Sequence, residues 1–304
     1  MVTAQPEFRS TENDPLLTRR ALLRRGVTDT EIRTARRSGT IVPVRRGCFA
    51  ETAQITASSP EERHLLMARA ALDAASSNLV LSHESAALAW GFDLWRGAPE
   101  LVHLTTDRPT GGRIDRTRHV HAHRLDAEDV TERHGLPITT AARTVADLAC
   151  ALPFDEAVCV GDSALRSRAV TSELLAAALA RCGRRRGTAK ARRVLPFVDG
   201  RSESIGESRS RAYFDRFDVP APDLQVEIVV DGKTFRVDFL WDGVVGEFDG
   251  LSKYAGDQGG DAVVREKLRE DALRAAGYVV IRWTWADLAD GRLARRVLAA
   301  VAAR

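Results

Sequence analysis

The chain has 304 residues, of which 44% are hydrophobic and 29% are charged, as is ordinary for a globular protein with two or three domains. It contains no apolar run long enough to span a bilayer and no signal-peptide pattern, so we expect a cytoplasmic protein without a membrane partner. Its four cysteines are scattered without a C-x-x-C pair, which argues against a zinc ribbon or a redox pair and favours buried free thiols.

The net charge of +3 conceals an excess of arginine near the N-terminus. Residues 1–50 contain ten arginines and five acidic residues, whereas the rest of the chain carries 35 basic and 37 acidic residues. A basic arm on a nearly neutral body favours a polyanionic partner. A merely solvated arginine-rich surface is the alternative.

Residues 14–25 and 29–37 have the pattern of two helices joined by a turn at Gly26. The dipeptide Asp14-Pro15 predicts an N-cap followed by proline at the first helical position. The second helix opens with a T-x-x-E capping box. This second helix carries three arginines: Arg33, Arg36 and Arg37. The arrangement predicts a helix-turn-helix.

Residues 41–50 read as two short strands around a basic turn, which is the pattern of a wing. The turn contains Arg45 and Arg46. Arginines in a wing and on the second helix would contact DNA phosphates, which position a protein, and guanine edges, which specify sequence.

The string TRRALLRRGVTDTEIRTARRSGTIVPVRRGCFA resembles the winged-helix N-terminal domain of the AbiEi-type antitoxins of type IV toxin–antitoxin systems. The resemblance covers residues 14–50 and implies binding to promoter DNA, with a cognate toxin, as gene or protein, as a further partner. We therefore expect a winged helix-turn-helix domain over residues 1–58. A protein-binding role is the alternative, because the first helix of a complete winged helix is not evident.

Residues 59–198 are expected to form a mixed α/β middle domain with a helical linker. Helices are predicted from Pro60 to Ala75 and from Thr140 to Ala149, and strands over residues 101–105 and 119–124. The strings LSHESAALAWG and GLPITTAARTVADLA resemble the middle region of AbiEi-like proteins.

Two patterns of basic residues in this region, one of histidines and one of arginines, are interpreted as structural. His119, His121 and His123 alternate on a predicted strand and share one face, where three imidazoles could bind zinc. Neighbours along one strand seldom converge tetrahedrally, however, and no companion carboxylate is evident, so we interpret them as a half-exposed strand face. The arginine-rich run 181–193 is interpreted as a solvated linker, with a DNA contact as the alternative.

From residue 202 onward the pattern predicts the order helix, strand, strand, strand, helix, strand, closed by a helix over residues 293–303. Asp231-Gly232 predicts a two-residue hairpin turn of type I′ between the first two strands. The long helix is predicted from residue 261 to 276, with three inward side chains: Val264, Leu268 and Leu273.

Acidic residues interrupt the apolar pattern of these strands. Asp238 lies on the second strand, and Glu247 and Asp249 share a face of the third. A carboxylate in an apolar strand is costly unless it is paired, hydrogen-bonded or bound to a metal. The alternative is that these are surface carboxylates on the solvated face of a hairpin.

The strings FRVDFLWDGVVGEFDGLSKY and REKLREDALRAAGYVVIRWTWADL are similar to a domain that resembles the very-short-patch-repair endonucleases. Those enzymes belong to the PD-(D/E)XK, or restriction-endonuclease-like, superfamily. The resemblance implies a nuclease-like domain over residues 199–304, with Mg²⁺ held by Asp238 and Glu247 and with Glu207 as an outlying acid. Glu207 also completes a capping box with Ser204, so helix initiation is an alternative explanation for it.

The family's lysine two residues after Glu247 is absent, and Asp249 stands in its place. Lys253, or Lys267 on the long helix, could supply the missing positive charge. The expectation is thus a multidomain α+β protein that binds DNA and has a Mg²⁺-dependent endonuclease domain, acting in phage defence, a toxin–antitoxin system or DNA repair. The alternative is a non-catalytic autoregulator or antitoxin whose nuclease-like domain only binds.

Overall fold

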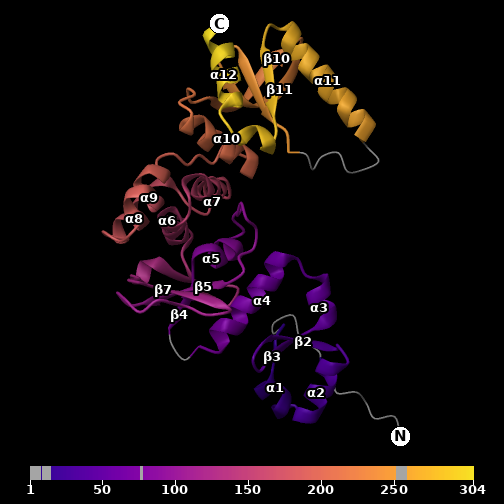
Figure 1. The fold of residues 1–304 in the computed structure, drawn as a ribbon, viewed down its shortest axis with the longest axis vertical. Coiled ribbons are helices and arrows are strands. Elements are labelled where there is room, and N and C mark those ends of the chain that lie inside the picture. The colour runs from indigo at the N-terminus through magenta and orange to yellow at the C-terminus, as the bar shows by residue number, and fades with distance from the viewer. Residues whose placement is uncertain (1–7, 9–14, 76–77, 251–258) are drawn as a thin grey trace. The chain divides into compact units, whose positions relative to one another are not determined.

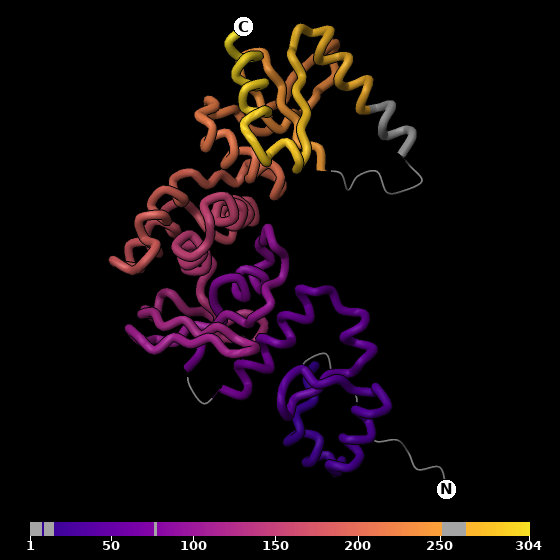
Figure 2. The backbone as a smooth tube through the Cα atoms, viewed as in Figure 1, coloured from indigo at the N-terminus to yellow at the C-terminus, as the bar shows by residue number. Residues whose placement is uncertain are grey.

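The computed structural model describes residues 8, 15–75, 78–250 and 259–304, without side chains for 259–265. The chain divides into two compact units, one formed by residues 1–148 with 177–184 and the other by residues 149–176 with 185–304 (Figures 1 and 2). The predicted boundaries after residues 58 and 198 are not tested by this division, so the three-domain organisation stays a prediction.

The architecture is multidomain α+β, as predicted. Both halves of the described chain contain helices, and its three sheets are divided between them. In the part of the chain that the structure describes, no helix combines the length and the apolar character needed to cross a membrane.

The N-terminal part of the first unit consists of β1 (Leu17–Thr18), α1 (Arg19–Arg24), α2 (Asp29–Arg37), β2 (Ile41–Arg45) and β3 (Cys48–Glu51). The strands form an antiparallel sheet in the order β1-β3-β2. The predicted capping box is present at the start of α2, where Thr28 and Glu31 each satisfy the other's backbone N–H. Two helices followed by a hairpin that turns at Arg46 and Gly47 confirm the predicted order of elements.

The first helix begins later than predicted. Asp14 lies outside the described residues, and Leu17 pairs with Phe49 as a strand. Thr18 is the N-cap, and its hydroxyl accepts a hydrogen bond from the Ala21 N–H at 3.1 Å. The predicted start at Pro15 was therefore wrong, because a long-range strand pairing takes residues that local propensity would assign to the helix.

The rest of the first unit is built on a six-stranded mixed sheet in the order β6-β7-β5-β4-β9-β8. Its elements are α3 (Thr52–Ala57), α4 (Pro60–Asp73), β4 (Leu79–Leu81), α5 (His83–Trp90), β5 (Val102–Asp107), β6 (Arg113–Ile114), β7 (Arg118–His123), η1 (Ala127–Asp129), β8 (Val130–Arg133), β9 (Leu136–Thr139) and α6 (Ala141–Ala151). Small and branched side chains of α4 and α5 pack on the sheet around Leu81 and Leu104, both fully buried. The predicted helices and strands of this region are confirmed, with ends that differ by one or two residues.

A buried ion-pair network links η1, α6 and α8 (Ser172–Arg181). Arg143 is 1% exposed and donates hydrogen bonds to Asp129 at 2.5 Å and to Asp147 at 2.8 Å. Arg181 donates to the second oxygen of Asp129 at 2.8 Å. The interpretation of residues 181–193 as a solvated linker was therefore wrong at Arg181, which neutralises a buried acid. Arg184, Arg186, Arg192 and Arg193 are exposed, and residues 188–194 form a helix, α9 (Thr188–Val194).

The second unit contains a four-stranded sheet in the order β10-β11-β12-β13, in which the first three strands are antiparallel and β13 runs parallel to β12. Its elements are α7 (Phe154–Arg166), α9, α10 (Ile205–Arg216), β10 (Asp223–Val230), β11 (Lys233–Trp241), β12 (Val244–Phe248), α11 (Gly259–Ala275), β13 (Val279–Trp283), η3 (Trp285–Leu288) and α12 (Arg292–Ala302). Residues of α10 and α12 form one core cluster with the sheet, and Leu273 of α11 belongs to another (Figure 1). The predicted order from α10 to β13 is confirmed.

Two detailed predictions for this unit had opposite outcomes. Asp231 and Gly232 have φ values of 50° and 73°, which confirms the type I′ turn. Leu273 is buried as predicted, whereas Leu268 is 63% exposed, so its predicted inward position was wrong. Arg269, four residues before Leu273, takes the sheet-facing position, because residues four apart share one side of a helix. The side chain of Val264 lies outside the described part of the chain.

Gly246 on β12 is expected to tolerate no side chain. A Cβ atom there would lie 2.6 Å from the Trp283 ring and 2.8 Å from the Trp241 ring. Gly246→Ala should therefore lower the free energy of unfolding by about 1–3 kcal/mol through overpacking. At Gly250 a Cβ would meet only an ordinary contact of 3.6 Å, so Gly250→Ala is the matched control. Urea unfolding followed by tryptophan fluorescence measures both, and equal losses in the two variants would contradict the packing argument.

Candidate functional site

A row of polar residues crosses the sheet of the second unit. The register of the neighbouring pairs places Gln225 of β10 opposite Asp238 of β11, and Asp238 opposite Glu247 of β12. Glu247 pairs directly with Arg282 of β13. Directly opposed residues on neighbouring strands have their Cβ atoms about 5 Å apart. The strands therefore bring Asp238 and Glu247 side by side, as the sequence predicted.

Asp238 is the central acid of this row. Its carboxylate accepts a hydrogen bond from the Phe248 N–H at 2.9 Å, which turns it toward the end of β12. Its negative charge contributes to raising the pKa of both Glu207 and Glu247. Both glutamates are 7% exposed. Asp238 on β11 therefore acts on one glutamate of α10 and one of β12 through a medium that screens charge poorly.

Glu247 has a strongly raised pKa. Burial is the main cause and the charge of Asp238 the next, and together they raise the pKa of Glu247 to about 8 against the lowering influence of Arg269 and Arg282. Arg269 of α11 donates to the Glu247 carboxylate at 2.6 Å. Sequence reasoning missed Arg269, although its spacing of four residues from the inward Leu273 could have revealed it.

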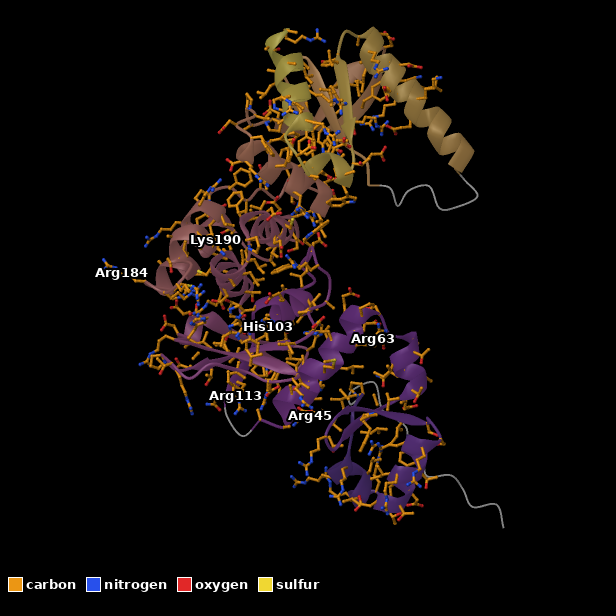
Figure 3. All side chains as sticks on the ribbon, in the orientation of Figure 1. Arg45, Arg63, His103, Arg113, Arg184 and Lys190 are labelled. Carbon is orange, nitrogen blue, oxygen red and sulfur yellow. The ribbon has the colours of Figure 1, made fainter. Side chains whose placement is uncertain are left out.

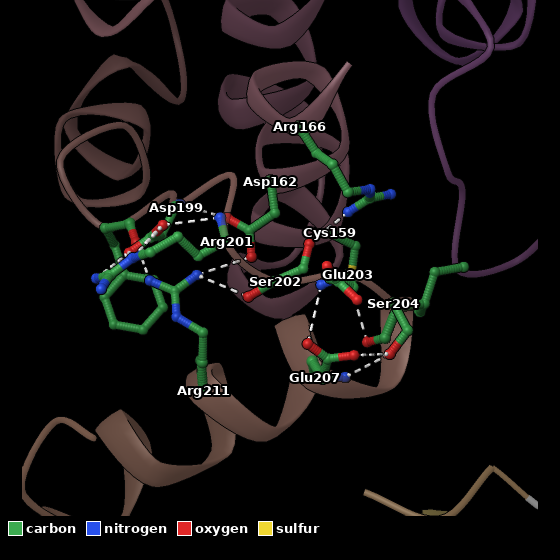
Figure 4. Close-up of polar contacts among 12 residues, drawn as sticks. Cys159, Asp162, Arg166, Asp199, Arg201, Ser202, Glu203, Ser204, Glu207 and Arg211 are labelled. Carbon is green, nitrogen blue, oxygen red and sulfur yellow. Dashed lines mark hydrogen bonds and ion pairs between the residues drawn. The ribbon is translucent and has the colours of Figure 1, made fainter. Parts of the chain in front are cut away.

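Glu207 lies in the first turn of α10, but the complete capping box predicted with Ser204 is not formed, because the Glu207 carboxylate accepts from the Glu203 N–H. Ser204 caps α10 by accepting a hydrogen bond from the Glu207 N–H at 3.1 Å, and its hydroxyl donates to the Glu207 carboxylate at 2.9 Å. The Glu203 N–H donates to that carboxylate at 2.9 Å (Figure 4), as does the Gln225 amide at 2.8 Å. Burial raises the pKa of Glu207, the Glu203 N–H lowers it, and Asp238 raises it. Glu207 therefore takes part in the start of α10 and also interacts with Asp238.

Gln225 was not predicted as part of the site. Its φ of 54° is unusual for a residue with a side chain, and such strain in folded proteins is concentrated at functional positions. The amide of Gln225 reaches Glu207 and so connects α10 to the polar row. Nothing in the local pattern of β10 signals this conformation, because a glutamine on a half-exposed strand is ordinary.

The prediction that Lys253 or Lys267 replaces the missing lysine stays a prediction. Asp249 lies just beyond β12, 3.8 Å from Arg282, which also pairs with Glu266 at 2.9 Å. Lys253 lies outside the described residues, and Lys267 is exposed on α11. The positive charges beside the acids are therefore arginines, Arg269 and Arg282.

Glu207, Asp238 and Glu247 do not form a group whose ligand atoms all lie within 4.8 Å of one another; in the described chain such groups of three consist of histidines. A metal ion held by Asp238 and Glu247 alone stays a prediction. Carboxylate oxygens are the ligands that Mg²⁺ prefers, and it often uses only one or two of them with water completing the shell.

The raised pKa of Glu247 predicts a pH-dependent stability. The folded protein holds the Glu247 proton up to about pH 8, whereas an unfolded glutamate loses it near pH 4.5. The stabilisation is complete below pH 4.5 and is lost as the pH rises to 8, by at most about 1.4 kcal/mol for each pH unit in that window.

Unfolding free energies at pH 5, 6, 7 and 8 test this expectation. The stability of the wild type should fall relative to Glu247→Gln across the window, while Glu227→Gln, an exposed residue on β10, should follow the wild type. Parallel curves for the wild type and Glu247→Gln would contradict the raised pKa. Added Mg²⁺ should shift the window to lower pH, because a cation favours the ionised carboxylate.

The arginines predicted to contact DNA fall into two groups. Arg33, Arg36 and Arg37 are exposed on α2, and Arg46 is exposed in the turn between β2 and β3. Arg45, labelled in Figure 3, is half-buried and donates a hydrogen bond to the Ala70 carbonyl at the end of α4 at 2.7 Å. Arg45 is therefore held by the fold. Among the exposed arginines, Arg33 donates to the Thr30 hydroxyl at 3.1 Å and the Arg36 guanidinium lies over the Phe49 ring, 5.8 Å from its centroid.

Two proteins of Mycobacterium tuberculosis are similar to this chain: the uncharacterized protein MT2308 of strain CDC 1551 / Oshkosh and the uncharacterized protein Rv2248 of strain ATCC 25618 / H37Rv. Each is 30% identical over 243 residues, which cover 78% of this chain and 87% of the relative. The chain belongs to the family of these proteins. The alignment is longer than either compact unit, so members of the MT2308 family share parts of both.

No family model matches the chain. Among solved structures, the crystal structure of the RV2827C protein from Mycobacterium tuberculosis is similar with a TM-score of 0.43 and 19% identity, over 64% of this chain and 80% of that chain. Similarity at this level does not establish a shared fold.

Proposed function

We propose that this member of the MT2308 family binds DNA through α2 and the β2–β3 hairpin, and that the polar row of its second unit hydrolyses phosphodiester bonds with a divalent metal ion. The observation that carries the proposal is the convergence of Glu207, Asp238 and Glu247, in which Asp238 raises the pKa of both glutamates. Mutually perturbed carboxylates on adjoining elements are typical of cation-binding and catalytic sites.

The donor set fits Mg²⁺ in its chemistry. Asp238 and Glu247 offer hard oxygen ligands from neighbouring strands, and a nearby cation would relieve the repulsion that raises the pKa of Glu247. Asp238 and Glu247 would hold the ion, with Glu207 reaching the same cluster from α10. A bound Mg²⁺ would supply Lewis-acid polarisation of the phosphate and a more acidic water.

The protein's own groups supply the remaining parts. Arg269 orients the Glu247 carboxylate through its 2.6 Å hydrogen bond. Arg282, 29% exposed beside Asp249, offers a guanidinium that can stabilise negative charge on a phosphate. Gln225 and Ser204 hold the Glu207 carboxylate by hydrogen bonds, as Arg269 holds that of Glu247. Such preorganised charges act without rearrangement during the reaction.

One observation favours a non-catalytic function instead. Glu247 already has a cationic partner in Arg269, and Asp249 stands where the nuclease-like families carry a lysine. An ion pair of this kind satisfies a buried acid without metal. In this second candidate function, the protein is a DNA-binding autoregulator or antitoxin whose second unit binds nucleic acid or a toxin without cutting.

One assay distinguishes the two proposed functions. Purified full-length protein is incubated with plasmid, single-stranded DNA and its own promoter fragment, in EDTA, Mg²⁺ or Mn²⁺. The nuclease proposal expects cutting only with a metal ion, together with promoter binding in EDTA. Promoter binding without cutting under every metal would reject the nuclease and leave the autoregulator. Cutting that survives Asp238→Ala combined with Glu247→Ala would place the activity elsewhere.

DNA binding by the first unit predicts a specific salt effect. Arg36→Ala combined with Arg37→Ala removes two exposed charges, so the slope of log affinity against log salt should fall by about 2 if each meets a phosphate. The exposed pair Arg295 and Arg296 on α12 is the matched control. Fluorescence anisotropy with promoter DNA measures both, and an equal change of slope in the control would contradict a specific interface on α2.

A further inference from the structure

Histidines gather in the first unit on the six-stranded sheet and the helices beside it. Six of the seven histidines of the chain belong to this group: His64, His83, His103, His119, His121 and His123. Neither the composition nor the proposed nuclease accounts for such a concentration. The group lies in the other unit from the polar row and is independent of it.

The sheet register explains how these side chains meet. Strands β5 and β7 run parallel, with His103 opposite His119 and Thr105 opposite His121. Alternate residues of a strand share a face, so His103, His119 and His121 lie on one side of the sheet. His83, at the start of α5, stacks on His121 with ring centroids 3.6 Å apart. The three histidines His119, His121 and His123 are half-buried, as a half-exposed strand face requires, but that interpretation missed the histidines that β5 and α5 contribute.

The spacing of one subset fits a metal ion. His103 Nδ1 and His121 Nε2 are 3.1 Å apart, and the ligand atoms of His103, His119 and His121 all lie within 4.8 Å of one another. Tetrahedral Zn²⁺ with bonds of about 2.0–2.1 Å separates adjacent ligand atoms by roughly 3.3–3.4 Å. Small side-chain adjustments would bring the three nitrogens to that distance.

The companion carboxylate that the sequence did not reveal is Glu84 of α5. Its Oε2 atom lies 3.0 Å from His103 Nδ1, and its side chain is 21% exposed. Glu84 is not part of the group whose ligand atoms all lie within 4.8 Å of one another, so its side chain would have to move from His103 toward the other two rings. With that movement, three imidazoles and one carboxylate make a four-ligand set of the kind that Zn²⁺ accepts. The position of Glu84 beside His103 also ties the first turn of α5 to β5 (Figure 3 labels His103).

The imidazole rings of His103, His119 and His121 are in the neutral form that binds a metal ion. Burial, followed by the charges of His119 and His64, lowers the pKa of His103 to about 4, and burial also lowers the pKa of His119 and of His121. A neutral imidazole offers a lone pair on one nitrogen and carries its proton on the other, so these rings need only the right tautomer, without loss of a proton, to bind a metal ion.

The second histidine triad is less suitable. His83, His121 and His123 also have ligand atoms within 4.8 Å, but the rings of His83 and His121 are nearly parallel, with an interplanar angle of 14°. Nitrogen lone pairs lie in the ring plane, so stacked rings do not direct them to one point. The rings of His103 and His119 are tilted by 58°, and the other two pairs of the first triad by 31° and 32°.

We propose that His103, His119 and His121, with Glu84 as the fourth ligand, bind one Zn²⁺ ion in the first unit. A closed set of four protein ligands is that of a structural site. The ion would cross-link β5, β7 and α5, and it would stabilise the unit that carries the predicted DNA-binding helices.

Full-length protein freed of metal by chelation and then titrated with Co²⁺ tests the site. Co²⁺ should bind at one equivalent, develop the intense visible bands of tetrahedral coordination, and be displaced by Zn²⁺. A pale octahedral spectrum, or binding without defined stoichiometry, would overturn the proposal, and this result needs no variant.

Variants locate the ion. His103→Gln combined with His121→Gln should weaken Zn²⁺ binding by about 100-fold or more, and Glu84→Gln by about tenfold. His134→Gln, which changes an exposed histidine outside the group, should bind as the wild type does. Zn²⁺ should raise the melting temperature of the wild type and of His134→Gln but not of the double variant. A folded double variant with wild-type affinity would overturn the assignment.

Discussion

Asp238→Asn is expected to reduce metal-dependent DNA cleavage by about a thousandfold. Removing the central carboxylate would take away a proposed metal ligand together with the charge that perturbs Glu207 and Glu247. Metal-assisted stabilisation of a phosphoryl transition state is worth several kcal/mol, and each 1.36 kcal/mol is about a factor of ten in rate. The substituted amide oxygen can still accept the Phe248 N–H, so the fold should persist.

Single-turnover cleavage of labelled DNA, with protein in excess, measures this loss without interference from product release. Asp242→Asn is the matched control, because Asp242 is exposed in the turn between β11 and β12 and lies outside the row. The control should cut at the wild-type rate, and both variants should bind promoter DNA as tightly as the wild type. A variant that lacks the Asp238 carboxylate yet cuts at the wild-type rate would remove Asp238 from the catalytic site.

Arg143→Ala is expected to lower the stability of the first unit by about 3–5 kcal/mol. The guanidinium is 1% exposed and satisfies Asp129 and Asp147, both fully buried. Removing the guanidinium takes the ion pair from the buried Asp147 and leaves Asp129 with Arg181 as its cationic partner, which costs far more than an exposed pair contributes. Because stabilities of whole domains are only about 5–15 kcal/mol, much of the unit should be unfolded at elevated temperature.

Urea unfolding followed by circular dichroism tests this loss. Arg19→Ala is the control, since Arg19 pairs with Asp29 on the surface, and its unfolding curve should remain close to that of the wild type. Arg143→Met, which fills the space without a charge, should also be strongly destabilised, because Asp129 and Asp147 would still be left without their shared partner. Equal urea-unfolding midpoints for Arg143→Ala and the wild type would show that this ion-pair network does not stabilise the unit.

The elements that could be predicted from the sequence are those with a local physical cause. The Asp231-Gly232 turn follows from the need for two positive φ values, and the start of α2 follows from the Thr28 and Glu31 capping box. The proximity of Asp238 and Glu247 follows from strand alternation around a two-residue turn.

The elements that could not be predicted depend on contacts between residues far apart in the chain. The pairing of Leu17 with Phe49 shortens α1, and the burial of Arg143 depends on acids in η1 and α6. Likewise, Arg269 reaches Glu247 only because α11 packs on the sheet. A single sequence shows Leu17, Arg143 and Arg269 but does not show the distant residue that each of them contacts.

The central claim, that the polar row binds a divalent cation, is tested most directly by locating Mn²⁺ in a crystal of the protein through its anomalous scattering. We predict a peak bonded to both the Asp238 and Glu247 carboxylates, with Arg269 displaced from Glu247. An undisturbed contact between Arg269 and Glu247, without a peak between the two acids at a saturating Mn²⁺ concentration, would contradict it.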